Sequence, residues 1–101
     1  MKRILTAVAL SSVALLAHAE KDACTQIAEA AEVAMEARQE GITMLELARS
    51  MDDAGVSASD KKFAMSIASM AYKHPIVQGK EAKANAIKEF GNEAYIGCSG
   101  G

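Results

Sequence analysis

Apolar residues recur three and four positions apart along most of the chain after residue 21, which is the spacing of helices that bury one face. The first stretch predicts a helix from about Asp22 to Gln39. Gly41 follows as its stop, because glycine readily takes the left-handed conformation that closes a helix. The stripe expected to face inward consists of Cys24, Ile27, Ala28, Ala31, Ala34, Met35 and Arg38.

The second helix has the clearest start signal in the sequence. Thr43 and Glu46 have the spacing of a capping box, in which each side chain accepts a hydrogen bond from a free backbone N–H group of the first turn. The helix is expected to end near Asp53, with Gly55 beyond it. The residues expected to be buried are Met44, Leu47, Ala48 and Met51.

Two more helices follow at similar spacing. The third begins after Ser57 or Ser59, either of which can cap it, and ends before Pro75. Its inward residues are predicted to be Phe63, Ile67, Met70 and Ala71. The fourth runs from about Lys80 to Ile96, and residues 97–101 are expected to fray. Its inward line is Lys83, Ile87, Phe90, Ala94 and Cys98. The pattern predicts an all-α fold, a compact bundle of about four short helices.

The first residues have the pattern of a secretory signal peptide. Lys2 and Arg3 precede an apolar run over residues 4–17, and small residues stand at 17 and 19, the −3 and −1 positions of a cleavage site. The apolar run is shorter than the roughly 20 residues that cross a bilayer, although an uncleaved membrane anchor is the alternative. We therefore expect a cleavable signal peptide over residues 1–19 and a single helical domain over 20–101. The mature domain is expected to be periplasmic or secreted, without membrane insertion.

Cys24 and Cys98 lie near the two ends of that domain. Cysteines of an exported chain normally pair, so a disulfide between the ends is expected, with two free thiols as the alternative. In the chain-entropy model a loop of this length contributes about 4 kcal/mol. The sequence has no Cys-x-x-Cys pair, which argues against catalytic redox chemistry.

The charge of the expected domain is acidic and uneven. Residues 20–53 carry nine acidic and three basic residues, whereas residues 54–101 carry four acidic and six basic residues. Nucleic-acid binding favours a basic surface that also carries aromatic residues, so this class is set aside.

The sequence offers little that could perform chemistry. Glu29, Glu32 and Glu36 recur on one side of the first helix, but a single line of carboxylates is more typical of a solvated face than of a calcium site, which takes six to eight oxygens from several directions. His74 is the one histidine of the expected domain, and we expect it to lie at a helix end and not to bind zinc. No serine can be placed beside it. We therefore expect no enzyme activity, no cofactor and no metal.

The methionines suggest adaptable contact with another protein, because methionine is flexible and polarisable. Most of them are expected to fill the core between alanines. The candidate partner-binding residues are Glu29, Glu32, Glu36, Arg38, Arg49, Met44 and Met51.

Several short segments also resemble a known group of proteins. They are Cys24, the run Ala37-Arg38-Gln39-Glu40-Gly41, Ala71-Tyr72 with Pro75, and the run from Ala86 to Asn92 that leads to Cys98. In these segments the chain resembles small exported bacterial and prophage-encoded proteins of unassigned function. The resemblance implies a helical secreted domain with a terminal disulfide. In architecture alone, the chain is also similar to the HdeA type of periplasmic acid-stress chaperone.

These observations favour a protein-binding module, an exported modulator or inhibitor of an envelope or phage-related partner. The alternative is a pH-responsive periplasmic chaperone, because below about pH 3 most carboxylates would be protonated and the positive charges would repel one another. A small-ligand carrier would need a cavity that so short a chain is not expected to enclose. The sequence leaves a homodimer open.

Overall fold

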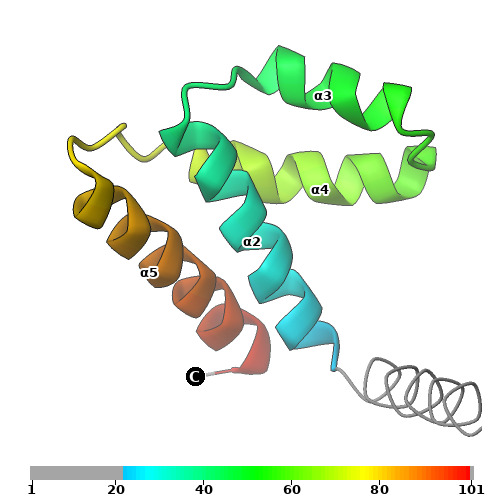
Figure 1. Ribbon diagram of the computed structural model, residues 1–101. Coiled ribbons are helices and arrows are strands. Elements are labelled where there is room, and N and C mark those ends of the chain that lie inside the picture. The colour runs from blue at the N-terminus through cyan, green and yellow to red at the C-terminus, as the bar shows by residue number, and fades with distance from the viewer. Residues whose placement is uncertain (1–21, 101) are drawn as a thin grey trace, which may run out of the picture.

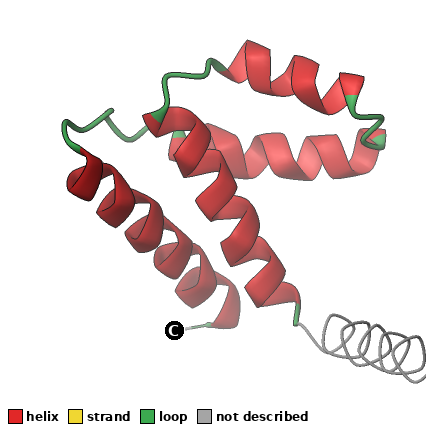
Figure 2. Ribbon diagram, in the orientation of Figure 1, coloured by secondary structure: helices red, strands yellow, loops and turns green. Residues whose placement is uncertain are grey.

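The computed structural model describes residues 22–100, and over this range the chain forms four helices and no strand (Figure 2). The helices are α2 (Ala23–Gln39), α3 (Met44–Asp53), α4 (Ala58–Ala71) and α5 (Lys80–Ser99). The predicted all-α bundle is therefore confirmed. The predicted signal peptide and its cleavage site after Ala19 lie outside the described residues.

The helices form two antiparallel pairs, and α2 packs against both its own partner and one helix of the other pair (Figure 1). One pair consists of α2 and α5, which lie along each other. The other is the hairpin of α3 and α4, in which α4 packs across α2. Because α4 covers one side of the α2–α5 pair, the opposite side of that pair faces away from the hairpin.

The helix starts follow local sequence signals. Asp22 caps α2 by accepting a hydrogen bond from the Thr25 backbone N–H at 2.7 Å, and the capping box of Thr43 and Glu46 is present at α3. Ser57, not Ser59, caps α4. The backbone N–H groups that donate to the carboxylates of Asp22 and Glu46 hold the pKa of each below its usual value.

Gly41 ends α2 as predicted. Its φ of +82° places it in the left-handed region, and the Ile42 N–H donates back to the Ala37 carbonyl at 3.0 Å. This pair of features is the Schellman arrangement, which satisfies carbonyls that a helix end otherwise leaves free.

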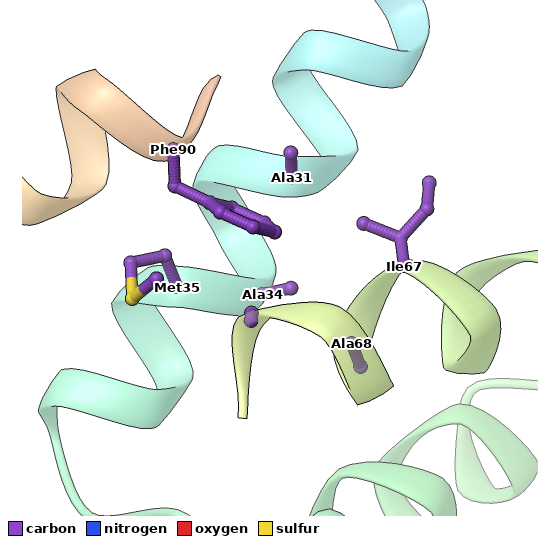
Figure 3. Close-up of a cluster of buried hydrophobic side chains, with 7 residues drawn as sticks. Ala31, Ala34, Met35, Ile67, Ala68 and Phe90 are labelled. Atoms are coloured by element: carbon purple, nitrogen blue, oxygen red, sulfur yellow. The ribbon is translucent and has the colours of Figure 1, made fainter. Parts of the chain in front are cut away.

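The core is small and rich in alanine (Figure 3). It lies where α2, α4 and α5 meet, and the short alanine side chains let the helices approach closely. Among its larger members, Met35 is 1 % exposed and Phe90 is 6 % exposed. The buried hydrophobic residues are Ala31, Ala34, Met35, Ala37, Ile67, Ala68, Ala71 and Phe90.

The predicted inward faces of α3 and α4 are partly wrong. Phe63 and Met70 are each half-exposed, because α4 turns Ala68 and Ala71 toward α2 and leaves the larger side chains at the edge of that contact. On α3 no residue is fully buried, since its packing partner is α4 and it lies outside the contact with α2. The predicted stripe of α3, at 44, 47, 48 and 51, is only partly covered.

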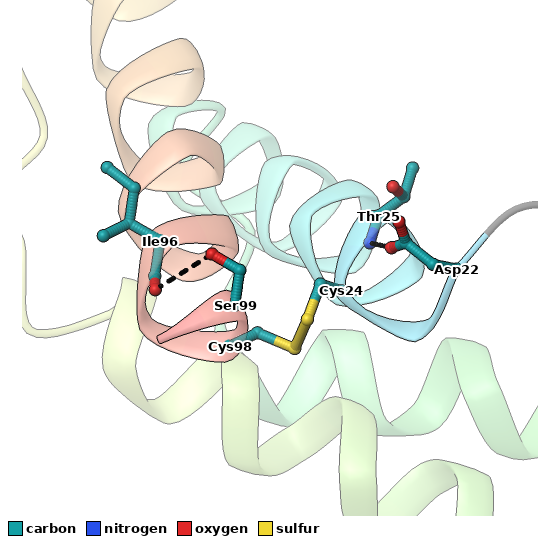
Figure 4. The surroundings of a disulfide bond; sticks show 6 residues. All are labelled: Asp22, Cys24, Thr25, Ile96, Cys98 and Ser99. Carbon is teal, nitrogen blue, oxygen red and sulfur yellow. Dashed lines mark hydrogen bonds between the residues drawn. A yellow bond between two sulfur atoms is a disulfide. The ribbon is translucent and has the colours of Figure 1, made fainter. Parts of the chain in front are cut away.

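The predicted end of the last helix is also wrong. α5 continues to Ser99 and closes at Gly100, whose φ is +88°, so residues 97–99 are helical and do not fray. Two contacts account for this extra turn (Figure 4). The Cys98 sulfur is bonded to Cys24 on α2, and the Ser99 hydroxyl donates to the Ile96 carbonyl at 3.3 Å.

The C-terminal end of α2 is tied to the end of α4 and to the loop that follows it. The Arg38 Nε donates to the His74 carbonyl at 2.9 Å, and its guanidinium lies over the Tyr72 ring. The Tyr72 hydroxyl donates to the Ile42 carbonyl at 2.6 Å. Burial raises the pKa of Tyr72, so this phenol remains a protonated donor at neutral pH.

Replacement of Tyr72 by phenylalanine is therefore expected to lower the free energy of unfolding by about 1 kcal/mol, since it removes one partly buried hydrogen bond and leaves the ring in place. Urea unfolding followed by circular dichroism measures the change. Y95F is the matched control, because Tyr95 is more exposed and its hydroxyl makes no hydrogen bond within residues 22–100. An equal loss in both variants would contradict the assigned role of the Tyr72 hydroxyl.

Candidate functional site

The predicted disulfide is present between Cys24 and Cys98 (Figure 4). It joins the first turn of α2 to the last turn of α5, with the two Cα atoms 5.4 Å apart. Residues 22–100 contain no free cysteine, so within this range no thiol is available as a nucleophile or a metal ligand. The bond fixes the antiparallel alignment of α2 and α5, and with it the two grooves described next.

One groove, of about 770 Å³, lies between α2 and α5 on the side facing away from α4, and we call it the polar groove. Because the two helices are antiparallel, the first half of α2 faces the middle and end of α5. The residues that line the groove are Thr25, Ala28, Glu29 and Glu32 from α2, and Asn85, Lys88, Glu89, Gly91, Asn92 and Tyr95 from α5.

Gly91 permits the close approach of the two helices at this groove. A Cβ atom at position 91 would lie 2.5 Å from the Cγ of Glu32, which is too close for any side chain there without a shift. The Glu32 side chain therefore lies across the backbone of α5. Its carboxylate lies beside Gly91, at the groove.

The polar groove is acidic and carries one aromatic ring. It holds the carboxylates of Glu29, Glu32 and Glu89 and a single amine, that of Lys88. Tyr95 is 39 % exposed and presents part of its ring to solvent. Carboxylates accept hydrogen bonds from lysine and arginine, and an aromatic face attracts cations, so this arrangement suits a basic segment of another molecule.

The predicted contact residues fall in several places. Glu29 and Glu32 line the polar groove, whereas Glu36 is exposed one turn further along α2 and does not line it. Arg38 is engaged with His74 and Tyr72 in the tie between α2 and the loop after α4. On α3, Arg49 is exposed while Met44 and Met51 are partly buried. The structure thus brings together only two of the seven, and sets the others apart.

Sequence reasoning missed the α5 wall of the polar groove. Asn85, Glu89, Asn92 and Tyr95 follow one another at helical spacing on the side of α5 opposite its apolar line. A signal was present, because a disulfide between the start of one helix and the end of another brings these ends together, and two such helices that also pack side by side are antiparallel. That alignment places position 92 of α5 near the first half of α2.

A second groove, of about 590 Å³, lies on the opposite side of the α2–α5 pair, between that pair and α4, and we call it the apolar groove. Ile27, Ile67, Met70, Phe90 and Ala94 supply its apolar surface. Its remaining lining residues are Lys73, His74, Glu93, Gly97 and Cys98. Met70 lines this groove, whereas Met44 and Met51, the methionines named as candidate contact residues, do not line it.

The described residues offer no arrangement for metal binding, since no group of three His, Cys, Asp or Glu side chains in 22–100 could hold an ion. His74 follows α4 and packs edge-on against the Phe90 ring, with the ring centroids 5.3 Å apart.

Comparison of the chain with protein-family models, with curated proteins and with solved structures finds no match. Among the helices within residues 22–100, none is both long enough and apolar enough to cross a bilayer.

Proposed function

We propose that this protein is an exported module that binds a basic segment of another protein in the polar groove, and that it acts as a modulator or inhibitor of an envelope or phage-related partner. The observation that carries the proposal is the meeting of Glu29 and Glu32 on α2 with Glu89 and Tyr95 on α5, around a hollow of about 770 Å³. Export is supported by the signal-like pattern of residues 1–19 and by the disulfide, a bond that is typical of oxidising compartments.

Charge and shape both favour a basic segment. The carboxylates of Glu32 and Glu89 outnumber the one amine of Lys88, so the groove attracts positive charge and speeds the encounter with a cationic surface. The volume falls within the range of about 300–1,000 Å³ that is usual for binding pockets. Amide groups of Asn85 and Asn92 add donors and acceptors for a peptide backbone.

The rigidity of the walls adds to the argument. The disulfide and the helix contact at Gly91 hold the two walls at a fixed spacing, which reduces the entropy lost on binding. Glu32 is already placed across the groove before any partner arrives. Preorganisation of this kind raises the affinity for a basic segment that fits the spacing of the walls.

The test compares a double variant, E32Q together with E89Q, with a matched control, E36Q, which removes one exposed carboxylate from α2 outside the groove. The probe is a fluorescent ten-residue peptide of alternating arginine and serine, titrated at low and at physiological salt. The double variant is expected to bind about tenfold more weakly than the parent chain, since each lost charge contributes up to about 1 kcal/mol. The control is expected to change binding by less than twofold.

Partner capture then connects the groove to function. The parent chain and both variants are used to capture proteins from envelope extract, and the captured proteins are identified by mass spectrometry. One stoichiometric partner that is retained by E36Q and lost by the double variant supports the proposal. Equal retention by all three chains, or equal weakening by the control, overturns the polar groove as the binding site.

A further inference from the structure

The apolar groove leaves large apolar side chains of α4 half-exposed, as a surface that packs against another molecule does. α4 places Phe63, Ile67 and Met70 on one stripe, at positions i, i+4 and i+7. Ile67 is buried against α2 and α5. Phe63 and Met70, which lie one turn before and one turn after it on the stripe, are each 50 % exposed. The core beneath is composed largely of alanine, so the largest apolar side chains of α4 are placed at the surface.

The charges at the rim of this groove are of opposite sign. Lys73, at the end of α4, and Glu93, on α5, both line it. Neither makes an ion pair with any residue in 22–100, and His74 lies on the same rim. As far as residues 22–100 are concerned, the groove thus carries one unpaired cation and one unpaired anion around an apolar floor.

We propose that a second copy of this chain covers the apolar groove about a two-fold axis, so that Lys73 of each copy faces Glu93 of the other. A two-fold interface is self-complementary, since any contact between residues i and j occurs a second time between j and i. A surface with one cation and one anion beside an apolar stripe meets this requirement without any other molecule. The second copy would bury Met70 and Phe63, which the monomer leaves half-exposed.

Other occupants fit these charges less well. An anionic lipid or fatty acid would satisfy Lys73 and place its negative charge near Glu93. A basic segment, as proposed for the polar groove, would be repelled by Lys73. The dimer also leaves both polar grooves facing outward, because they lie on the side of the α2–α5 pair away from α4. The proposed dimer does not depend on the proposed function, because its test measures the mass of the protein in solution and not the binding of a partner.

The first experiment measures the mass of the oxidised protein, expressed from the full 101-residue sequence, by sedimentation equilibrium from about 1 μM to 1 mM. A dimer is expected within this range. M70E is expected to raise the dissociation constant at least 100-fold, because it places a charge in the centre of the interface. The matched control is L45E on α3, where the replaced leucine is 59 % exposed and glutamate suits the first turn of a helix.

The second experiment uses the rim charges and does not disturb the apolar surface. K73E and E93K, each alone, place like charges opposite each other twice per dimer and are expected to weaken self-association about tenfold or more. An equimolar mixture of the two variants pairs opposite charges at both positions, so it is expected to form a heterodimer of near-parental affinity. The double variant K73E/E93K is expected to self-associate like the parent chain.

Recovery of association in the mixture would show that charge repulsion across the interface weakens each single variant. Loss of folding in a variant could not be repaired by mixing. Circular dichroism of each variant checks that the helices are retained. A chain that remains monomeric up to 1 mM overturns the proposal. The proposal is also overturned if the dimer persists in M70E, or if the mixture of K73E and E93K associates no better than either variant alone. Either result would place the interface on another face.

Discussion

Replacement of both Cys24 and Cys98 by alanine is expected to lower the free energy of unfolding by about 4 kcal/mol, and reduction of the parent chain by a thiol reagent is expected to have the same effect. The two residues are 74 positions apart, so the bond closes a loop that spans nearly all the described residues. In the chain-entropy model, the bond lowers the conformational entropy of the unfolded chain, so less entropy is lost when the chain folds.

The structure gives a second reason for a large effect. α2 and α5 are the first and last helices described, and α5 is joined to the bundle mainly by its packing along α2. Without the bond, the last turn of α5 is held only by exposed contacts, among them that of Ser99 with the Ile96 carbonyl. We expect this turn to fray and Phe90 to lose part of its cover.

The measurement is urea unfolding of the oxidised parent chain, the reduced parent chain and the double alanine variant. The variant serves as the control, since its stability should not respond to the reductant. A loss below about 1 kcal/mol would show that helix packing alone aligns α2 and α5. In that case the polar groove would keep its shape in a reducing compartment.

Local signals in the sequence were sufficient to locate the helices. The capping box of Thr43 and Glu46, the cap at Ser57 and the stop at Gly41 each act within one turn of chain, so a reader of the sequence can recognise them. The pairing of the two cysteines needed only the assumption of an oxidising compartment. The end of α5 was missed because its last turn depends on the distant bond to Cys24 as well as on the local contact of Ser99 and the stop at Gly100.

The rotation of each helix about its axis was harder to predict. On α4, both the stripe of Phe63 and Met70 and the stripe of Ala68 and Ala71 are apolar, and the spacing does not say which one faces α2. Ala68 and Ala71 face α2 because their small side chains allow close packing between the helices. Met70 is therefore left at the surface, where it lines the apolar groove. The candidate contact residues were scattered for the same reason, since a groove is formed by two helices whose relative rotation the sequence does not state.

Gln39 is a further residue whose role only the structure reveals. Its side chain is 3 % exposed, an unusual position for an amide at the end of a helix. The Nε2 group donates to the Pro75 carbonyl at 3.0 Å, and the Oε1 atom accepts from the Val77 N–H at 2.9 Å. A single amide thus satisfies both a donor and an acceptor in the loop between α4 and α5.

Replacement of Gln39 by leucine is expected to lower the free energy of unfolding by about 2 kcal/mol, because it leaves these two partly buried backbone groups without their partner while keeping a side chain of similar size. Q78L is the matched control, since Gln78 is exposed in the same loop. Urea unfolding of the two variants measures the difference. A similar loss in both would mean that water replaces the amide at no cost.

Glutamate at the same position separates hydrogen bonding from packing. In Q39E the carboxylate still accepts from the Val77 N–H, but it cannot donate to the Pro75 carbonyl and places a negative charge against it.

Burial and that carbonyl should raise the pKa of the new carboxyl in the folded state above its value in the unfolded chain. A group whose folded pKa is raised stabilises the fold more as the pH falls, so the deficit of Q39E relative to the parent chain should shrink between about pH 7 and pH 4. The deficit of Gln39→Leu should stay constant over the same range, because leucine does not titrate. If the two deficits change in parallel with pH, the loop is not held by the amide, and the stability that Gln39 confers comes from packing alone.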